Sequence, residues 1–115
     1  ILKLADGLGI RVAWLPFESE PPRCNLIVST VPAGSLIRRA EDLAARANAV
    51  FDVVYDPWPT PLAVAGKIAG ATVIDGLDLL AGQAVGQVQL MTGYPVPMDV
   101  LRSTAQNGLA EHARL

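Results

Sequence analysis

Short apolar runs alternate with longer amphipathic segments along this chain. Residues 10–15, 25–30, 50–55 and 71–74 are apolar runs of strand length, and several are rich in β-branched residues. Apolar residues recur at helical spacing within residues 1–8, 36–47, 61–69, 77–92 and 98–110. Apolar strands separated by helices are typical of a parallel sheet buried between helices, so the pattern predicts an α/β fold.

Residues that cap helices support several of these boundaries. Ser35 is predicted to cap the helix that follows it, and Thr60 is predicted to cap the next one with Pro61 at its first position. Gly7 or Gly9 would end the first helix. The longest segment, residues 77–92, carries an apolar stripe that consists of Leu77, Ala81, Ala84, Val88 and Met91.

Composition narrows the class of protein. The 115 residues are 51% hydrophobic and 17% charged, which indicates one compact domain and excludes a disordered tail. The net charge of −2 and the absence of a basic stripe argue against nucleic-acid binding. The apolar runs are too short to predict a membrane span. No cluster of His, Cys, Asp and Glu has metal-ligand spacing, so we predict no metal site.

Two further features concern the compartment and the ends of the chain. The single cysteine, Cys24, cannot form an intrachain disulfide, which favours a cytoplasmic protein. The sequence starts without Met and within a helical pattern, so we expect that the beginning of this helix lies upstream of Ile1.

Polar and turn-forming residues follow three of the predicted strands. These strand ends are residues 29–34, 55–61 and 75–78. Because parallel sheets bind ligands at the carboxyl ends of their strands, the three turns are the candidate functional site. Each turn on its own is more often only a connection.

Taken together, the turns resemble segments of shikimate dehydrogenases. Residues 26–34 (LIVSTVPAG) resemble the L-V-I-N-T-T-P-x-G segment of that family, and residues 55–62 (YDPWPTPL) match Y-x-P-x-x-T-P-L. Residues 75–84 (DGLDLLAGQA) resemble D-G-L-G-M-L-V-x-Q-A, and residues 90–97 (LMTGYPVP) resemble L-W-T-G-x-x-P-P. The order and spacing agree through nearly the whole chain.

This resemblance implies a fold, a cofactor and a set of site residues. Residues 1–115 would be a partial NADP-binding, Rossmann-like domain, the C-terminal half of a dinucleotide-binding domain followed by C-terminal helices. Tyr55 and Gln83 would bind substrate, whereas Thr30, Val53 and Gly76 would border the cofactor. The implied reaction is the reversible reduction of 3-dehydroshikimate to shikimate with NADPH.

The sequence also departs from the family pattern. Asp78 stands where the family usually has a second Gly, and we expect it either to disturb nicotinamide packing or to cap the helix that starts near Leu77. The family's Gly-rich phosphate turn, its Asn-Arg-Thr turn and its catalytic Lys and Asp are not in this sequence. Lys3 and Lys67 lack the matching context, so we assign no catalytic residue.

Two alternative functions stay open at this point. The protein could be a quinate or quinate/shikimate dehydrogenase that uses NAD, or a non-catalytic binding relative of the same fold. For a shikimate dehydrogenase and for a quinate dehydrogenase alike, the partner would be a small-molecule substrate. A separate expectation concerns association. This chain on its own should form a homodimer or self-associate, because a doubly wound domain divided in the middle exposes apolar surface.

Overall fold

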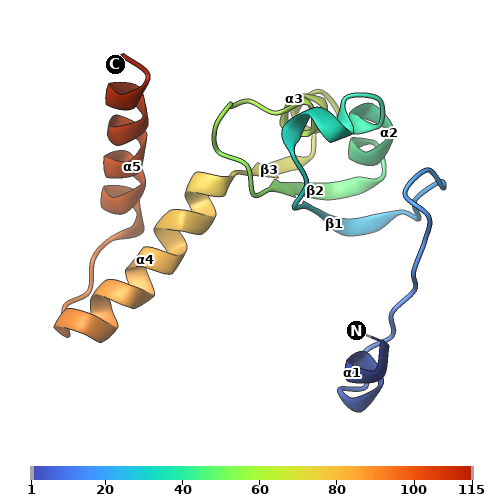
Figure 1. Ribbon diagram of the computed structural model, residues 1–115, viewed down its shortest axis with the longest axis horizontal. Helices are drawn as coiled ribbons and strands as arrows, with labels where there is room; N and C mark the ends of the chain where they lie inside the picture. Colours follow the sequence, from blue (N-terminus) through green and yellow to red (C-terminus); the bar gives the residue numbers. More distant parts are fainter. Residues whose placement is uncertain (1, 115) are drawn as a thin grey trace.

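A three-stranded parallel sheet lies at the centre of the computed structural model, which describes residues 2–114 (Figure 1). Its strands are β1 (Cys24–Ser29), β2 (Ala47–Asp52) and β3 (Thr72–Ile74), in the spatial order β1-β2-β3. Both neighbouring pairs are parallel, with Val28 opposite Phe51 and Phe51 opposite Ile74. The predicted parallel α/β fold is therefore confirmed.

Helices lie between and after the strands. A 3-10 helix η1 (Ala33–Leu36) and the α-helix α2 (Ala40–Ala44) connect β1 to β2, and α3 (Pro61–Ile68) connects β2 to β3. Figure 1 shows α2 and α3 on the same face of the sheet. The helix α4 (Gly76–Thr92) leads away from β3, and α5 (Met98–His112) turns back and contacts α4. The short α1 (Leu2–Gly7) lies apart from the sheet.

The core fills the space between the sheet and α3. Val50 and Leu62 are fully buried, and Leu36 of η1 joins them. Ile27, Val50 and Val73 are in register on neighbouring strands and pack into this cluster. A second small cluster of alanines closes the contact between α2 and α3. This layer holds the strand ends in fixed positions.

The other face of the sheet carries apolar side chains without a covering helix among residues 2–114. Leu26 and Val28 alternate with Ile27 and are 46% and 50% exposed. Their register partners, Ala49 and Phe51, are only half-buried. The described chain therefore covers one of the two faces that a doubly wound sheet normally buries.

The predicted strand at residues 10–15 is wrong, because this segment is irregular in the structure. Its side chains are exposed, with Trp14 at 81%. A strand needs a neighbour that pairs with its backbone groups, and within residues 2–114 this segment has none. The amide of Ile10 instead donates a hydrogen bond to the Ala5 carbonyl at 2.9 Å.

Ser35 does not cap a helix, so that prediction is also wrong. The Pro32–Gly34 turn winds directly into η1, and the Ser35 amide donates to the Pro32 carbonyl at 2.9 Å. The predicted helix over residues 36–47 is thus divided into η1 and α2, and β2 begins at Ala47 rather than at residue 50. The apolar stripe of α4 is buried only at Leu77 and Ala81, and Met91 is 86% exposed.

Candidate functional site

The carboxyl ends of the three strands lie along one edge of the sheet, as their parallel direction requires. Thr30 follows β1 directly, Val53 follows β2, and Gly76 begins α4 two residues after β3. The Val53 amide donates to the Ser29 carbonyl at 3.1 Å, which extends the pairing of β1 and β2 to this edge. The structure therefore places the three predicted cofactor-side residues on the edge where parallel sheets bind ligands.

Val53 and Gly76 are in direct contact. A Cβ atom at position 76 would lie 2.2 Å from the Val53 carbonyl oxygen, which is much closer than real Cβ atoms come. Only glycine fits, because the start of α4 packs on the backbone at the end of β2. Close packing within the protein thus explains Gly76, and its predicted place beside a cofactor stays a prediction.

A buried carboxylate braces the loop that carries Val53 and Tyr55. Asp52 is 1% exposed, and its Oδ2 accepts a hydrogen bond of 2.8 Å from the Thr60 hydroxyl. The Thr60 Oγ1 also accepts one from the Ala63 amide at 3.1 Å, so Thr60 is the N-cap of α3, as predicted. The Val54 amide donates to Asp52 Oδ1 at 3.3 Å. These hydrogen bonds of Asp52 connect the two ends of loop 53–60.

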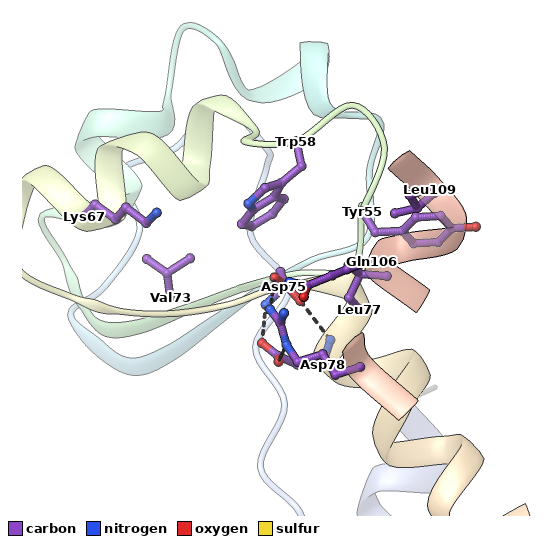
Figure 2. A pocket seen from close by; sticks show the side chains of 10 residues that line it. Tyr55, Trp58, Lys67, Val73, Asp75, Leu77, Asp78, Gln106 and Leu109 are labelled. Atoms are coloured by element: carbon purple, nitrogen blue, oxygen red, sulfur yellow. Dashed lines mark hydrogen bonds and ion pairs between the residues drawn. The ribbon is translucent and has the colours of Figure 1, made fainter. Parts of the chain in front are cut away.

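Tyr55 lies at a cavity between the sheet edge and the α4–α5 pair (Figure 2). The cavity measures about 440 Å³, and its lining also includes Trp58, Leu77 and Gln106. Tyr55 is 45% exposed, and within residues 2–114 its hydroxyl has no hydrogen-bond partner. The hydroxyl is therefore available to a ligand.

Gln83 and Thr30 do not line this cavity. Gln83 is exposed on α4, seven positions after Gly76, which corresponds to roughly 10 Å along the helix axis. Thr30 is exposed at the end of β1. The described residues thus bring Tyr55, Val53 and Gly76 near one another, and leave Gln83 on a separate, open surface.

Asp75 and Asp78 cap α4 together. The Asp78 amide donates to Asp75 Oδ1 at 2.8 Å, and the Asp75 amide donates to Asp78 Oδ2 at 3.1 Å. This reciprocal pair is a capping box, which satisfies two amides at the start of the helix. Of the two expectations for Asp78, helix capping is the one that the structure confirms.

Arg102 of α5 binds both of these carboxylates. Its Nη2 donates to Asp75 Oδ2 and its Nε donates to Asp78 Oδ1, each at 2.6 Å. Sequence analysis did not identify Arg102, since no local motif connects residues 24 positions apart. Asp52 was missed for a similar reason, because a carboxylate inside an apolar run gives no sign of its partner.

Asp78 and Arg102 stabilise each other's charged forms. Partial burial acts to raise the pKa of Asp78, but hydrogen bonds from Arg102 and the Asp75 amide outweigh it and hold this pKa below its ordinary value. The hydrogen bond to Asp78 in turn raises the pKa of Arg102. Asp78 therefore stays ionised, and Arg102 offsets part of the negative charge of the two carboxylates.

Neither a metal site nor a membrane helix is found in the described part of the chain. Residues 2–114 contain no group of three or more His, Cys, Asp or Glu side chains that could hold a metal ion. None of the helices over these residues has the length and apolar character that spanning a bilayer requires.

A parallel sheet with connecting helices, and with candidate ligand groups along its carboxyl edge, defines a Rossmann-like α/β domain. No family model matches the chain. It is 36% identical over 91 residues to the shikimate dehydrogenase (NADP(+)) of Methanocella arvoryzae, a match that covers 74% of this chain and 33% of that protein. The chain is homologous to shikimate dehydrogenases over most of its length and spans about a third of the length of this curated relative.

Solved structures agree with this assignment. A shikimate 5-dehydrogenase from Mycobacterium fortuitum superposes with a TM-score of 0.63 at 46% identity, covering 69% of this chain and 29% of that one. The shikimate 5-dehydrogenase of Thermus thermophilus in complex with shikimate gives a TM-score of 0.67 at 26% identity, covering 95% of this chain and 41% of the other. The resemblance inferred from the sequence is therefore confirmed.

Proposed function

We propose that this chain is the partial NADP-binding domain, with the C-terminal helices, of a cytoplasmic NADP-dependent shikimate dehydrogenase. The enzyme would reversibly reduce 3-dehydroshikimate to shikimate on the route to chorismate and the aromatic amino acids. The observation that carries the proposal is the place of Tyr55, which is 45% exposed and lines the cavity at the carboxyl edge of the sheet (Figure 2). The relatives' names support the substrate and the cofactor.

The residues of this chain would form one wall of the active site. Bound NADPH would supply the hydride, and the backbone at Val53 and Gly76 together with Thr30 would border its nicotinamide side. The Tyr55 hydroxyl would donate a hydrogen bond to the substrate, and the Gln83 amide can both donate to and accept from sugar-like hydroxyls. The phosphate-binding turn and the groups that transfer the proton would come from other parts of the full-length protein. This chain spans only about a third of the length of a curated relative, so such parts would lie outside it.

The function is tested by assaying the full-length natural protein with shikimate or quinate and with NADP⁺ or NAD⁺. Formation of NADPH that depends on shikimate is the expected result. Activity mainly with quinate and NAD⁺ would favour the quinate dehydrogenase alternative. Binding of shikimate without turnover in any combination would favour the non-catalytic relative.

Replacing Tyr55 by phenylalanine in the full-length protein is expected to weaken shikimate binding by about 1–3 kcal/mol, because one hydrogen bond to a buried ligand is lost. Titration calorimetry measures this change. Tyr94→Phe is the matched control, since the chain has only two tyrosines and Tyr94 is 74% exposed away from the described cavity. Equal affinity for Tyr55→Phe and wild type would remove Tyr55 from the site.

We also propose that residues 1–115, produced alone, self-associate through the uncovered sheet face. Leu26 and Val28 expose about half of their surface there on the edge strand β1, and an apolar edge strand promotes association. Sedimentation should show dimers or larger species, and the double substitution Leu26→Glu, Val28→Glu should shift them toward monomer. A monodisperse wild-type monomer would contradict this proposal.

A further inference from the structure

We propose that Arg102 is a positioning residue of the active site: from α5 it holds the Asp75–Asp78 cap, and through the cap it fixes Gly76 against Val53. This inference rests on the proposed function, because it concerns the geometry of the same site. Arg102 lines the same cavity as Tyr55, but both of its hydrogen bonds go to Asp75 and Asp78, so we assign it a positioning role rather than contact with a ligand.

The contacts form a continuous path from α5 to the sheet edge. Arg102 binds the Asp75 carboxylate, and Asp75 is both the N-cap of α4 and the residue directly before Gly76. Gly76 packs on the Val53 carbonyl without room for a methyl group. Because this contact is so close, a shift at the start of α4 changes the position of the Val53 backbone, and Tyr55 follows two residues later.

Arg102 matters more here than an ordinary surface ion pair. Exposed salt bridges contribute little, but this guanidinium joins two carboxylates that are themselves hydrogen-bonded to the start of a helix. The side chains of Arg102, Asp75 and Asp78 are 29%, 12% and 29% exposed, so solvent screens them only in part.

The apolar contacts of α5 are weak, which leaves the ionic contact as its main anchor. No residue of α5 is buried, and its N-cap residue Pro97 makes no side-chain hydrogen bond to the helix. Leu101, Ala105 and Leu109 are only half-buried. Losing the guanidinium should therefore loosen α5 and the first turn of α4 together.

The experiment compares Arg102→Gln with wild type in the full-length natural protein, with two readouts. Hydrogen exchange, followed by mass spectrometry, should become faster in peptides that cover residues 75–82, whose cap amides Arg102 stabilises. The kcat at saturating substrates should fall by about tenfold, since small displacements of reacting groups are costly. The Kd for NADPH, measured by titration, should change by less than about twofold, because dinucleotides are held largely through their phosphates, at a Gly-rich turn that is not in this sequence.

Three further variants make the test specific. Arg102→Lys keeps the charge but not the fork, and it should give intermediate values for exchange and kcat. Asp78→Asn combined with Arg102→Gln should be little worse than Arg102→Gln alone, as expected for residues that act as one unit. Arg38→Gln changes an exposed arginine in the turn between η1 and α2, and it should match wild type.

The possible results separate clearly. Unchanged exchange over residues 75–82 in Arg102→Gln would overturn the proposal, whatever happens to kcat. Faster exchange with unchanged kcat would also overturn it, because Arg102 would then stabilise the fold without positioning the site. If Arg102→Gln does not fold, Arg102→Lys gives the same comparison. If the wild-type protein lacks dehydrogenase activity, the proposed function fails, and the exchange data still show separately whether the α4 cap depends on Arg102.

Discussion

Replacing Gly76 by alanine should lower the free energy of unfolding by at least about 2 kcal/mol, since the new methyl group has no space. Its Cβ atom would lie 2.2 Å from the Val53 carbonyl oxygen and 2.8 Å from the carbonyl carbon. Both are backbone atoms, which cannot rotate away as a side chain does. Either α4 or the end of β2 must therefore move. Urea unfolding of the full-length protein, followed by circular dichroism, measures the change.

Gly82→Ala is the matched control, because Gly82 lies in the same helix and a Cβ atom there would meet nothing within 4 Å. Alanine is the better helix former by about 1 kcal/mol, so this variant should be as stable as wild type or more so. Gly66→Ala should fall between the two, since its closest neighbour is the Val50 side chain at 2.6 Å. If Gly76→Ala and Gly82→Ala were equally stable, the close contact between Gly76 and Val53 would be disproved.

Local patterns predicted much of this fold. Short apolar runs between amphipathic segments indicated parallel strands, and β1, β2 and β3 lie within a few residues of the expected positions. Thr60 followed by Pro61 contains its whole capping signal in adjacent residues, so this prediction was right. Residues 10–15 are different. Their composition favours a strand, but a strand also requires a neighbour, which a local pattern does not reveal.

The candidate site could be predicted only as far as neighbouring residues define it. The strand-end turns are visible in the sequence and indicated the edge of the sheet, and the resemblance to shikimate dehydrogenases then implied Tyr55, Val53 and Gly76. The contact of Gly76 with Val53 and the binding of two carboxylates by Arg102 depend on how α4 and α5 pack. Long-range contacts of this kind leave no local signal. The family pattern likewise gave no sign that Asp78 would pair with an arginine of the next helix.

The side chain of Thr60, which is hydrogen-bonded to Asp52, should matter to stability about as much as Gly76 does. We expect Thr60→Val to lower the free energy of unfolding by about 3 kcal/mol, the sum of two losses. The cap on the Ala63 amide contributes about 1 kcal/mol. The buried Asp52 carboxylate loses the hydroxyl that donates to it at 2.8 Å, and leaving such a group without a partner costs about 2 kcal/mol more. Urea unfolding of the full-length protein measures the sum.

Two substitutions separate the lost hydrogen bonds from other effects of the change. Thr60→Ser keeps the hydroxyl, so it should retain most of the stability that Thr60→Val loses. Ser29→Ala removes a buried hydroxyl that lies opposite Asp52 in register and has no partner within residues 2–114, so it should change stability little. If Thr60→Ser were as unstable as Thr60→Val, packing of the threonine methyl group rather than the hydrogen bond to Asp52 would hold loop 53–60 in place. Tyr55 lies in that loop, so the same comparison shows whether its position depends on the buried carboxylate.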